Sequence, residues 1–165
     1  MAEGAEDRLR ELGYELPAVP RPAGSYVPAT RAGAILFTAG QLPFVDGRLA
    51  YTGKVGANVS VEEAKEAAHL CALNALAAVK AETGTLENVR RVVKVAGYVA
   101  SAAGFNGQPE VMNGASDLLG KLFGARGLHA RTAVGVAELP LDAPVEVELV
   151  MELVSQWASQ QEGEL

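Results

Sequence analysis

The sequence predicts an α+β fold in which two helices cover one face of a mixed β-sheet. Nearly half of the 165 residues (49%) are hydrophobic, enough for the core of one domain. Two long segments carry helix signals, and several valine-rich segments have the composition of strands. Their order is three strands, a helix, a strand, a second helix and two closing strands. This order is typical of a sheet whose helices lie on one side.

The first 23 residues are expected to form an extension to the domain. Residues 6–12 can form a short helix with Leu9 and Leu12 on one face, and Pro17 and Pro22 then keep the chain extended. We expect the domain itself over residues 24–154 and a polar tail over residues 155–165. The domain opens with two strands, at residues 25–31 and 33–42, joined as a hairpin by Arg31-Ala32-Gly33. A short strand, LAYTG, is expected at residues 49–53.

The clearest single element is a long helix that begins at Ser60. Ser60 and Glu63 form a capping-box pattern, and Gly84 is a good terminator. Small residues recur at helical spacing and let the helix lie close to a sheet. The predicted inner face consists of Ala64, Ala67, Ala68, Cys71, Ala75 and Val79.

A short turn at residues 85–88 precedes a valine-rich strand at residues 89–101, and a second helix is expected at residues 108–124. The last two strands, joined at LPLDAP (139–144), are predicted to form an antiparallel hairpin. Ala133, Gly135 and Ala137 alternate along one strand, and Val145, Val147 and Leu149 along the other. We expect them to leave apolar surface on both faces of the sheet, which predicts a homo-oligomer.

Composition excludes several classes of function. The chain has 20 acidic and 14 basic residues, a formal charge of -6, and its basic residues are scattered, so general nucleic-acid binding is disfavoured. The N-terminus lacks the apolar stretch of a signal peptide, and no window resembles a membrane span. A single cysteine favours a reducing compartment, and we expect a cytoplasmic protein. The chain has only two histidines and no nucleotide-binding motif, so we expect it to bind neither a metal ion nor a cofactor.

Arg131 and Glu146 are the candidate functional pair. Arg131 begins a strand whose alternate residues are small, and Glu146 lies near the start of the next strand. The predicted hairpin would bring both toward one end of the sheet. One interpretation is an ordinary cross-strand ion pair, worth about 0–1 kcal/mol if exposed. The other is that Arg131 binds a substrate carboxylate through two parallel hydrogen bonds.

A resemblance to a known family bears on this choice. The stretch ARTAVGVAELPLDAPVEVELVMEL (130–153) resembles the C-terminal signature of the YjgF/Rid family, which includes imine and enamine deaminases and endoribonuclease L-PSP-like proteins. GSY (24–26), FTAGQLP (37–43), the helix from Ser60 and VMNGA (111–115) resemble other family segments in the same order. The resemblance covers nearly the whole predicted domain.

The resemblance implies a chorismate-mutase-like α+β fold and a barrel-like homotrimer with three clefts between subunits. Arg131 matches the arginine that grips the substrate carboxylate, and Glu146 matches the acidic residue that helps to place the hydrolytic water. Tyr26 matches the pocket tyrosine, Asn113 the asparagine that opens the second helix, and Gly40 a glycine whose backbone lines the cleft. From the residues alone, Tyr26 is equally well a half-buried strand residue and Asn113 a helix cap.

The sequence departs from the family pattern at two positions. Ala133 stands where many deaminases of the family carry cysteine, and Ala39 where many carry serine. A backbone carbonyl at Ala133 can still hold a water, so Ala133 remains a predicted substrate-binding position. The departures bear on substrate preference more than on fold.

The implied function is hydrolytic deamination of reactive 2-imino and enamino acids to 2-keto acids and ammonia, without a cofactor. The alternative is a trimeric protein that binds small carboxylates or keto acids without turning them over. Ribonuclease activity is a further alternative, which the acidic charge and the lack of a basic, aromatic groove disfavour.

Overall fold

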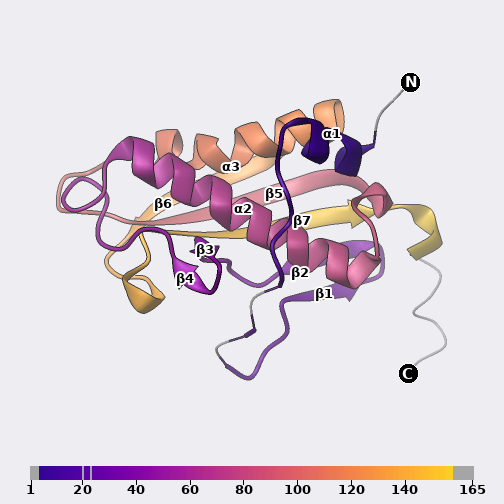
Figure 1. Ribbon diagram of the computed structural model, residues 1–165, viewed down its shortest axis with the longest axis horizontal. Helices are drawn as coiled ribbons and strands as arrows, with labels where there is room; N and C mark the ends of the chain where they lie inside the picture. Colours follow the sequence, from indigo (N-terminus) through magenta and orange to yellow (C-terminus); the bar gives the residue numbers. More distant parts are fainter. Residues whose placement is uncertain (1–3, 20, 23, 158–165) are drawn as a thin grey trace.

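In the computed structural model, which describes residues 4–19, 21–22 and 24–157, two long helices lie side by side on one face of a five-stranded sheet (Figure 1). The strand order in the sheet is β1-β2-β7-β5-β6. A separate two-stranded ribbon pairs β3 with β4. The elements are α1 (Ala5–Glu11), β1 (Ala29–Ala32), β2 (Ile35–Thr38), β3 (Phe44–Val45), β4 (Arg48–Leu49), α2 (Val61–Thr83), β5 (Val89–Ala100), α3 (Gln108–Phe123), β6 (Ala130–Val136) and β7 (Val145–Leu153), with 3-10 turns η1 (Leu86–Asn88), η2 (Gly124–Gly127), η3 (Pro140–Asp142) and η4 (Ser155–Trp157). The predicted α+β class is confirmed.

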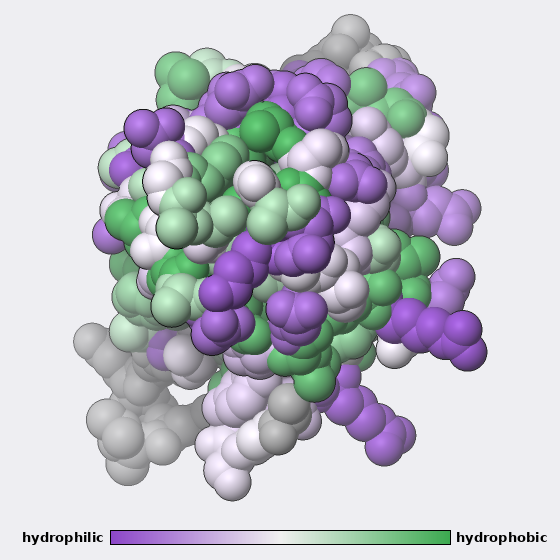
Figure 2. Space-filling view, turned by 90° about the vertical axis from the view of Figure 1, so that its left-hand side faces the viewer, coloured by the Kyte–Doolittle hydropathy of each residue, from purple (hydrophilic) through white to green (hydrophobic). Residues whose placement is uncertain are grey.

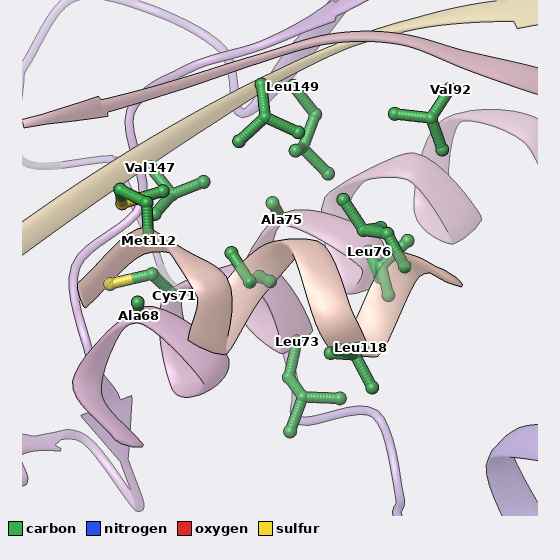
Figure 3. Close-up of a cluster of buried hydrophobic side chains, with 14 of the residues drawn as sticks. Ala68, Cys71, Leu73, Ala75, Leu76, Val92, Met112, Leu118, Val147 and Leu149 are labelled. Carbon is green, nitrogen blue, oxygen red and sulfur yellow. The ribbon is translucent and has the colours of Figure 1, made fainter. Parts of the chain in front are cut away.

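Helix α2 begins and ends at the residues that its sequence signals indicate. The Glu63 N–H donates to Ser60 Oγ at 3.2 Å, and the Ser60 N–H donates to Glu63 Oε2 at 2.8 Å. Gly84 ends the helix with a φ of 80°, a conformation that glycine adopts without strain. The six small residues of the predicted inner face are all buried. In the core, Ala68, Cys71 and Ala75 face Val147 and Leu149 of β7 and Met112 of α3 (Figure 3).

Helices α2 and α3 pack closely because α3 carries a glycine at their contact. A Cβ atom on Gly114 would overlap the backbone carbonyl oxygen of Lys65 in α2. Gly120, six residues further along α3 on a different side of the helix, faces open space. The contact at Gly114 therefore sets the separation of the two helices.

The predicted hairpin between the last two strands is wrong. Strand β5 lies between β6 and β7, pairing in parallel with β6 and antiparallel with β7. The connection passes across the end of β5 through η3, where Leu141 and Asp142 adopt positive φ. Two strands joined through a helix, as β5 and β6 are joined through α3, commonly pair in parallel. This longer-range pairing takes the place of the hairpin between β6 and β7.

The two faces of the sheet differ from the expectation. Val145, Val147 and Leu149 face the helices and are fully buried. Ala133 and Gly135 lie on the same face, because they pair with Gly97 and Val99 of β5, and Ala137 lies beyond β6. Apolar surface on the open face comes instead from residues such as Phe37 and Val134, about two-fifths exposed.

The open face of β7 is acidic. Glu146, Glu148 and Glu152 alternate along the strand, each partly buried. At the end of the molecule where α2 and α3 begin, hydrophobic and hydrophilic residues are interspersed over the surface (Figure 2). The homo-oligomer stays a prediction. The residues from which it was inferred do not leave apolar surface on both faces of the sheet, because those within β6 and β7 all face the helices.

The N-terminal segment packs on the helices. Ala5 and Leu9 of α1 are buried, whereas Leu12 is 41% exposed and does not share their face as expected. The chain then runs across α2, where the Tyr14 ring lies 4.7 Å from that of His69. The predicted strand at residues 49–53 is largely absent, since only Leu49 pairs, in β4. None of the helices that the structure describes is long and apolar enough to cross a membrane.

Candidate functional site

Arg131 lies on the helix side of β6 and is held by α3. Its Nη1 donates to Asn113 Oδ1 at 2.8 Å and to Ser116 Oγ at 3.2 Å, and its Nη2 donates to the Pro109 carbonyl at 3.0 Å. Among the described residues its Nε–H has no partner, so this donor is available to a ligand. We call Arg131, Asn113 and Ser116 the Arg131 cluster. Ala133 lies two residues further along the same face.

Glu146 lies in a cavity of about 360 Å³ that Tyr26 and Gly40 also line; we call it the Glu146 cavity. A Cβ on Gly40 would overlap the Glu146 carboxylate, so the glycine leaves the space that this side chain occupies. Burial raises the pKa of Glu146, and repulsion from Glu148 raises it further. The result is a half-buried carboxyl group that takes up a proton more readily than usual, a property of general acid-base residues.

The structure does not bring Arg131 and Glu146 together within one chain. Arg131 pairs with Val95, on the helix side of the sheet, whereas Glu146 pairs with Tyr98, on the open side. Successive residues of a strand point to opposite faces, so an odd separation along β5 places the two side chains on different faces. Both a cross-strand ion pair and a shared site within one chain are therefore wrong. Among the described residues, no ion pair joins Arg131 to a carboxylate.

The predicted residues thus form two groups. Arg131 lies with Asn113 and Ala133 on one face, and Glu146 lies with Tyr26 and Gly40 on the other. Ala39 adjoins the second group, and its backbone N–H donates to the Pro28 carbonyl at 2.8 Å. Whether these residues bind substrate stays a prediction.

Sequence reasoning did not assign a role to three residues at or beside these groups. Ser116 lies one helical turn from Asn113, and that spacing could have revealed it. His129 contacts Ser116, its Nε2 lying 3.0 Å from Ser116 Oγ. Arg21, from the N-terminal segment, lines the Glu146 cavity, and no motif in the sequence distinguishes it from other surface arginines.

Among the described residues, no three histidine, cysteine, aspartate or glutamate side chains are placed to share a metal ion. The one cysteine, Cys71, is buried, and burial raises the pKa of its thiol well above the ordinary value, with the charge of Glu146 adding to the rise. A buried thiol of raised pKa is a poor nucleophile. The chemistry available in the two groups is therefore carboxylate binding and proton transfer.

Comparisons with known proteins agree with this fold. A family model described as "YjgF/chorismate_mutase-like, putative endoribonuclease" matches residues 6–153. The protein TCP17 of Trypanosoma cruzi is 45% identical over 146 residues, which cover 88% of this chain and 91% of TCP17.

Two crystal structures are also similar. Atu1372 from Agrobacterium tumefaciens, a protein of unknown function, is 47% identical with a TM-score of 0.83, covering 90% of this chain and 91% of that one. A protein from Shewanella oneidensis named as a "putative endoribonuclease" is 35% identical with a TM-score of 0.89, covering 92% of this chain and 100% of that one. Fold and matches together define a chorismate-mutase-like α+β protein. The chain belongs to the YjgF family.

Proposed function

We propose that the protein is a hydrolase that converts reactive 2-imino and enamino acids to 2-keto acids and ammonia. The observation that carries this proposal is the Arg131 cluster. Three hydrogen bonds to α3 fix the guanidinium, and its Nε–H, which has no partner among the described residues, supplies a charged donor for a carboxylate. Glu146, with its raised pKa, supplies the proton-transfer group.

The proposed site lies between subunits. Arg131 and Glu146 point to opposite faces of one sheet, so a cleft that contains both needs Arg131 of one subunit and Glu146 of its neighbour. A closed ring of identical subunits forms such clefts by repeating one contact. We propose a homotrimer with three clefts, each also lined by Tyr26, Gly40, Asn113 and the Ala133 backbone.

The proposed reaction needs only water. The enamine first takes up a proton on carbon and loses one from nitrogen to water, which gives the imine. Water then adds to the imine carbon, Glu146 accepts the proton that the water loses, and the imine nitrogen gains a proton. The carbinolamine nitrogen then takes the proton held by Glu146 and leaves as ammonia, while the hydroxyl group returns its proton to Glu146 and its oxygen forms the carbonyl of the 2-keto acid. Arg131 orients the substrate through its carboxylate, and no cofactor takes part.

We infer a cytoplasmic setting, since the one cysteine is a buried free thiol.

The experiment generates 2-aminoacrylate from serine with a dehydratase and measures the release of pyruvate and ammonia above spontaneous hydrolysis. Arg131→Ala is expected to lower kcat/KM about a hundredfold, because the substrate is no longer held in one orientation. Arg10→Ala is the matched control, since Arg10 is an exposed arginine of α1. A wild-type protein that gives no acceleration, or an Arg131→Ala variant of full activity, contradicts the proposal.

Glu146→Gln separates catalysis from binding alone. A deaminase loses activity in this variant while it still binds 2-oxobutanoate, whereas a non-catalytic carboxylate binder has no activity to lose. The names of some relatives favour ribonuclease activity as a second candidate. RNA cleavage by the purified protein that survives Arg131→Ala would favour that candidate over deamination.

A further inference from the structure

His129 is linked to Arg131 through one hydroxyl group. His129 Nδ1 lies 2.6 Å from the Gly127 carbonyl oxygen, and its Nε2 lies 3.0 Å from Ser116 Oγ. Ser116 Oγ accepts in turn from Arg131 Nη1 at 3.2 Å. His129 and Ser116 are both partly buried, so these contacts are partly shielded from water.

The chemistry of these groups fixes where the protons lie. A carbonyl oxygen only accepts, so His129 Nδ1 carries a proton and donates it to Gly127. In the neutral ring Nε2 is then bare and accepts the proton of the Ser116 hydroxyl. With its proton directed to His129, the Ser116 oxygen presents its lone pairs to Arg131.

Ser116 would otherwise have a competing partner. A serine inside a helix commonly turns its hydroxyl proton to the carbonyl four residues earlier, which here belongs to Met112. In the structure the hydroxyl lies instead between His129 and Arg131. The histidine is therefore the group that selects the orientation in which Ser116 supports the guanidinium.

We propose that His129 is a positioning residue that acts through Ser116 to aim Arg131 at the substrate carboxylate. The inference rests on the proposed function, because it concerns the affinity of Arg131 for a carboxylate. Asn113 and the Pro109 carbonyl hold two other N–H groups, so Ser116 supplies the third point that fixes the guanidinium plane. If the hydrogen bond to Ser116 is lost, Arg131 stays in place but the plane of its guanidinium group can rotate.

The first test reads the histidine tautomer by long-range proton–nitrogen NMR of the full-length protein. The chain has only two histidines, so His69→Gln assigns the signals. We expect neutral His129 to carry its proton on Nδ1, opposite to the usual preference of a free imidazole, and Ser116→Ala to reduce that bias. A wild-type ring protonated on Nε2 would overturn the inference without reference to activity.

The second test measures 2-oxobutanoate affinity by calorimetry and 2-aminoacrylate turnover in parallel. Ser116→Ala and His129→Leu are each expected to weaken affinity and raise KM about tenfold, with kcat nearly unchanged, because a hydrogen bond to a charged group is lost. His129→Gln restores much of the affinity, since its amide oxygen can accept from Ser116. The double variant is no weaker than Ser116→Ala alone, because one residue acts through the other. His69→Gln leaves both measurements unchanged.

The wild-type protein separates the two proposals. A wild type that neither binds 2-oxobutanoate nor accelerates turnover overturns the proposed function and this inference with it. An active wild type whose His129→Leu and Ser116→Ala variants keep the wild-type KM overturns only the positioning role. Additive effects of the two substitutions also overturn it, because they would mean that His129 does not act through Ser116.

Discussion

At the scale of single residues, Glu146 connects the structure to pH. Burial and the charge of Glu148 raise its pKa, so the ionised form that accepts a proton from water is lost at a higher pH than for an ordinary glutamate. We expect kcat/KM to fall as the pH drops through this raised pKa. Glu148→Gln removes the repelling charge and should move the acidic limb of the profile to lower pH. An acidic limb that Glu148→Gln leaves in place would contradict this explanation.

The same shift has the opposite effect on stability. A carboxyl whose pKa is raised on folding stabilises the protein while it is protonated, and that contribution is lost as the pH rises through the folded-state pKa. At pH 7 the ionised Glu146 therefore costs stability. Glu146→Gln should abolish turnover and raise Tm by about 1–3 °C. Thermal unfolding at pH 7 checks this, with exposed Glu62→Gln as the control; a lower Tm in Glu146→Gln would argue against a desolvated carboxylate.

At the scale of elements, the contact of α2 with α3 depends on one glycine. Gly114→Ala drives a Cβ into the Lys65 backbone and should destabilise the protein by about 1–3 kcal/mol. Gly120→Ala, in the same helix, meets open space and should stabilise by about 0.5–1 kcal/mol, since alanine favours helix. Denaturant unfolding of both variants checks the pair. Equal effects would mean that helix propensity, not packing, decides at Gly114.

Helix α1 is held to the domain through Glu6. This side chain accepts from Lys80 Nζ at 2.9 Å, Thr85 Oγ1 at 2.8 Å and the Leu86 N–H at 2.9 Å. Burial raises the pKa of Glu6, but these partners outweigh it and leave the pKa below the ordinary 4.5. The stability that Glu6 contributes is therefore present above pH 4.5 and lost as the pH falls through its folded-state pKa.

Glu6→Gln should accordingly cost about 0.5–1 kcal/mol near neutral pH, a modest value because Glu6 is partly exposed. The difference from wild type should shrink as the pH falls below 4.5, where wild-type Glu6 begins to take up a proton. Denaturant unfolding at several pH values measures this. Glu15→Gln, at an exposed glutamate of the following segment, is the control. A difference that persists unchanged in acid would rule out the ionised pair as its cause.

Elements with local signals could be predicted from the sequence, and the order of the strands could not. Ser60, Glu63 and Gly84 define α2 by contacts within a few residues of its ends. Pairing of β6 with β5 instead depends on residues some 36 positions apart, such as Val95 and Arg131. Alternating hydrophobicity identifies a strand without naming its neighbour. For that reason the sequence predicts a hairpin of β6 with β7, although the two strands do not pair.

The same limit applies to the candidate site. Residue type and family resemblance identify Arg131 and Glu146 as candidates. The face of the sheet to which each side chain points depends on the register of its strand against β5. A register change of one residue would move either side chain to the other face. His129 and Ser116 lie 13 residues apart and carry no motif. Their link to Arg131 exists only once α3 has packed beside β6.

At the scale of the whole molecule, one chain holds two halves of the proposed site on opposite faces of its sheet. The acidic and apolar residues on the open face of β7 and β2 are the surface on which a neighbouring subunit would supply the missing half. We therefore expect Arg131 and Glu146 to work together only across subunits.

Complementation between two variants of low activity tests this arrangement. Arg131→Ala and Glu146→Gln subunits, each with a different affinity tag, are produced together, and oligomers that carry both tags are isolated and assayed. Any ring of three that contains both variants has one cleft with an intact Arg131 and an intact Glu146, so we predict about one third of wild-type turnover per trimer. Each variant alone should keep at most about a hundredth of the wild-type activity. Mixed oligomers that are as inactive as their parents would contradict the account, because they would mean that both residues must come from the same chain.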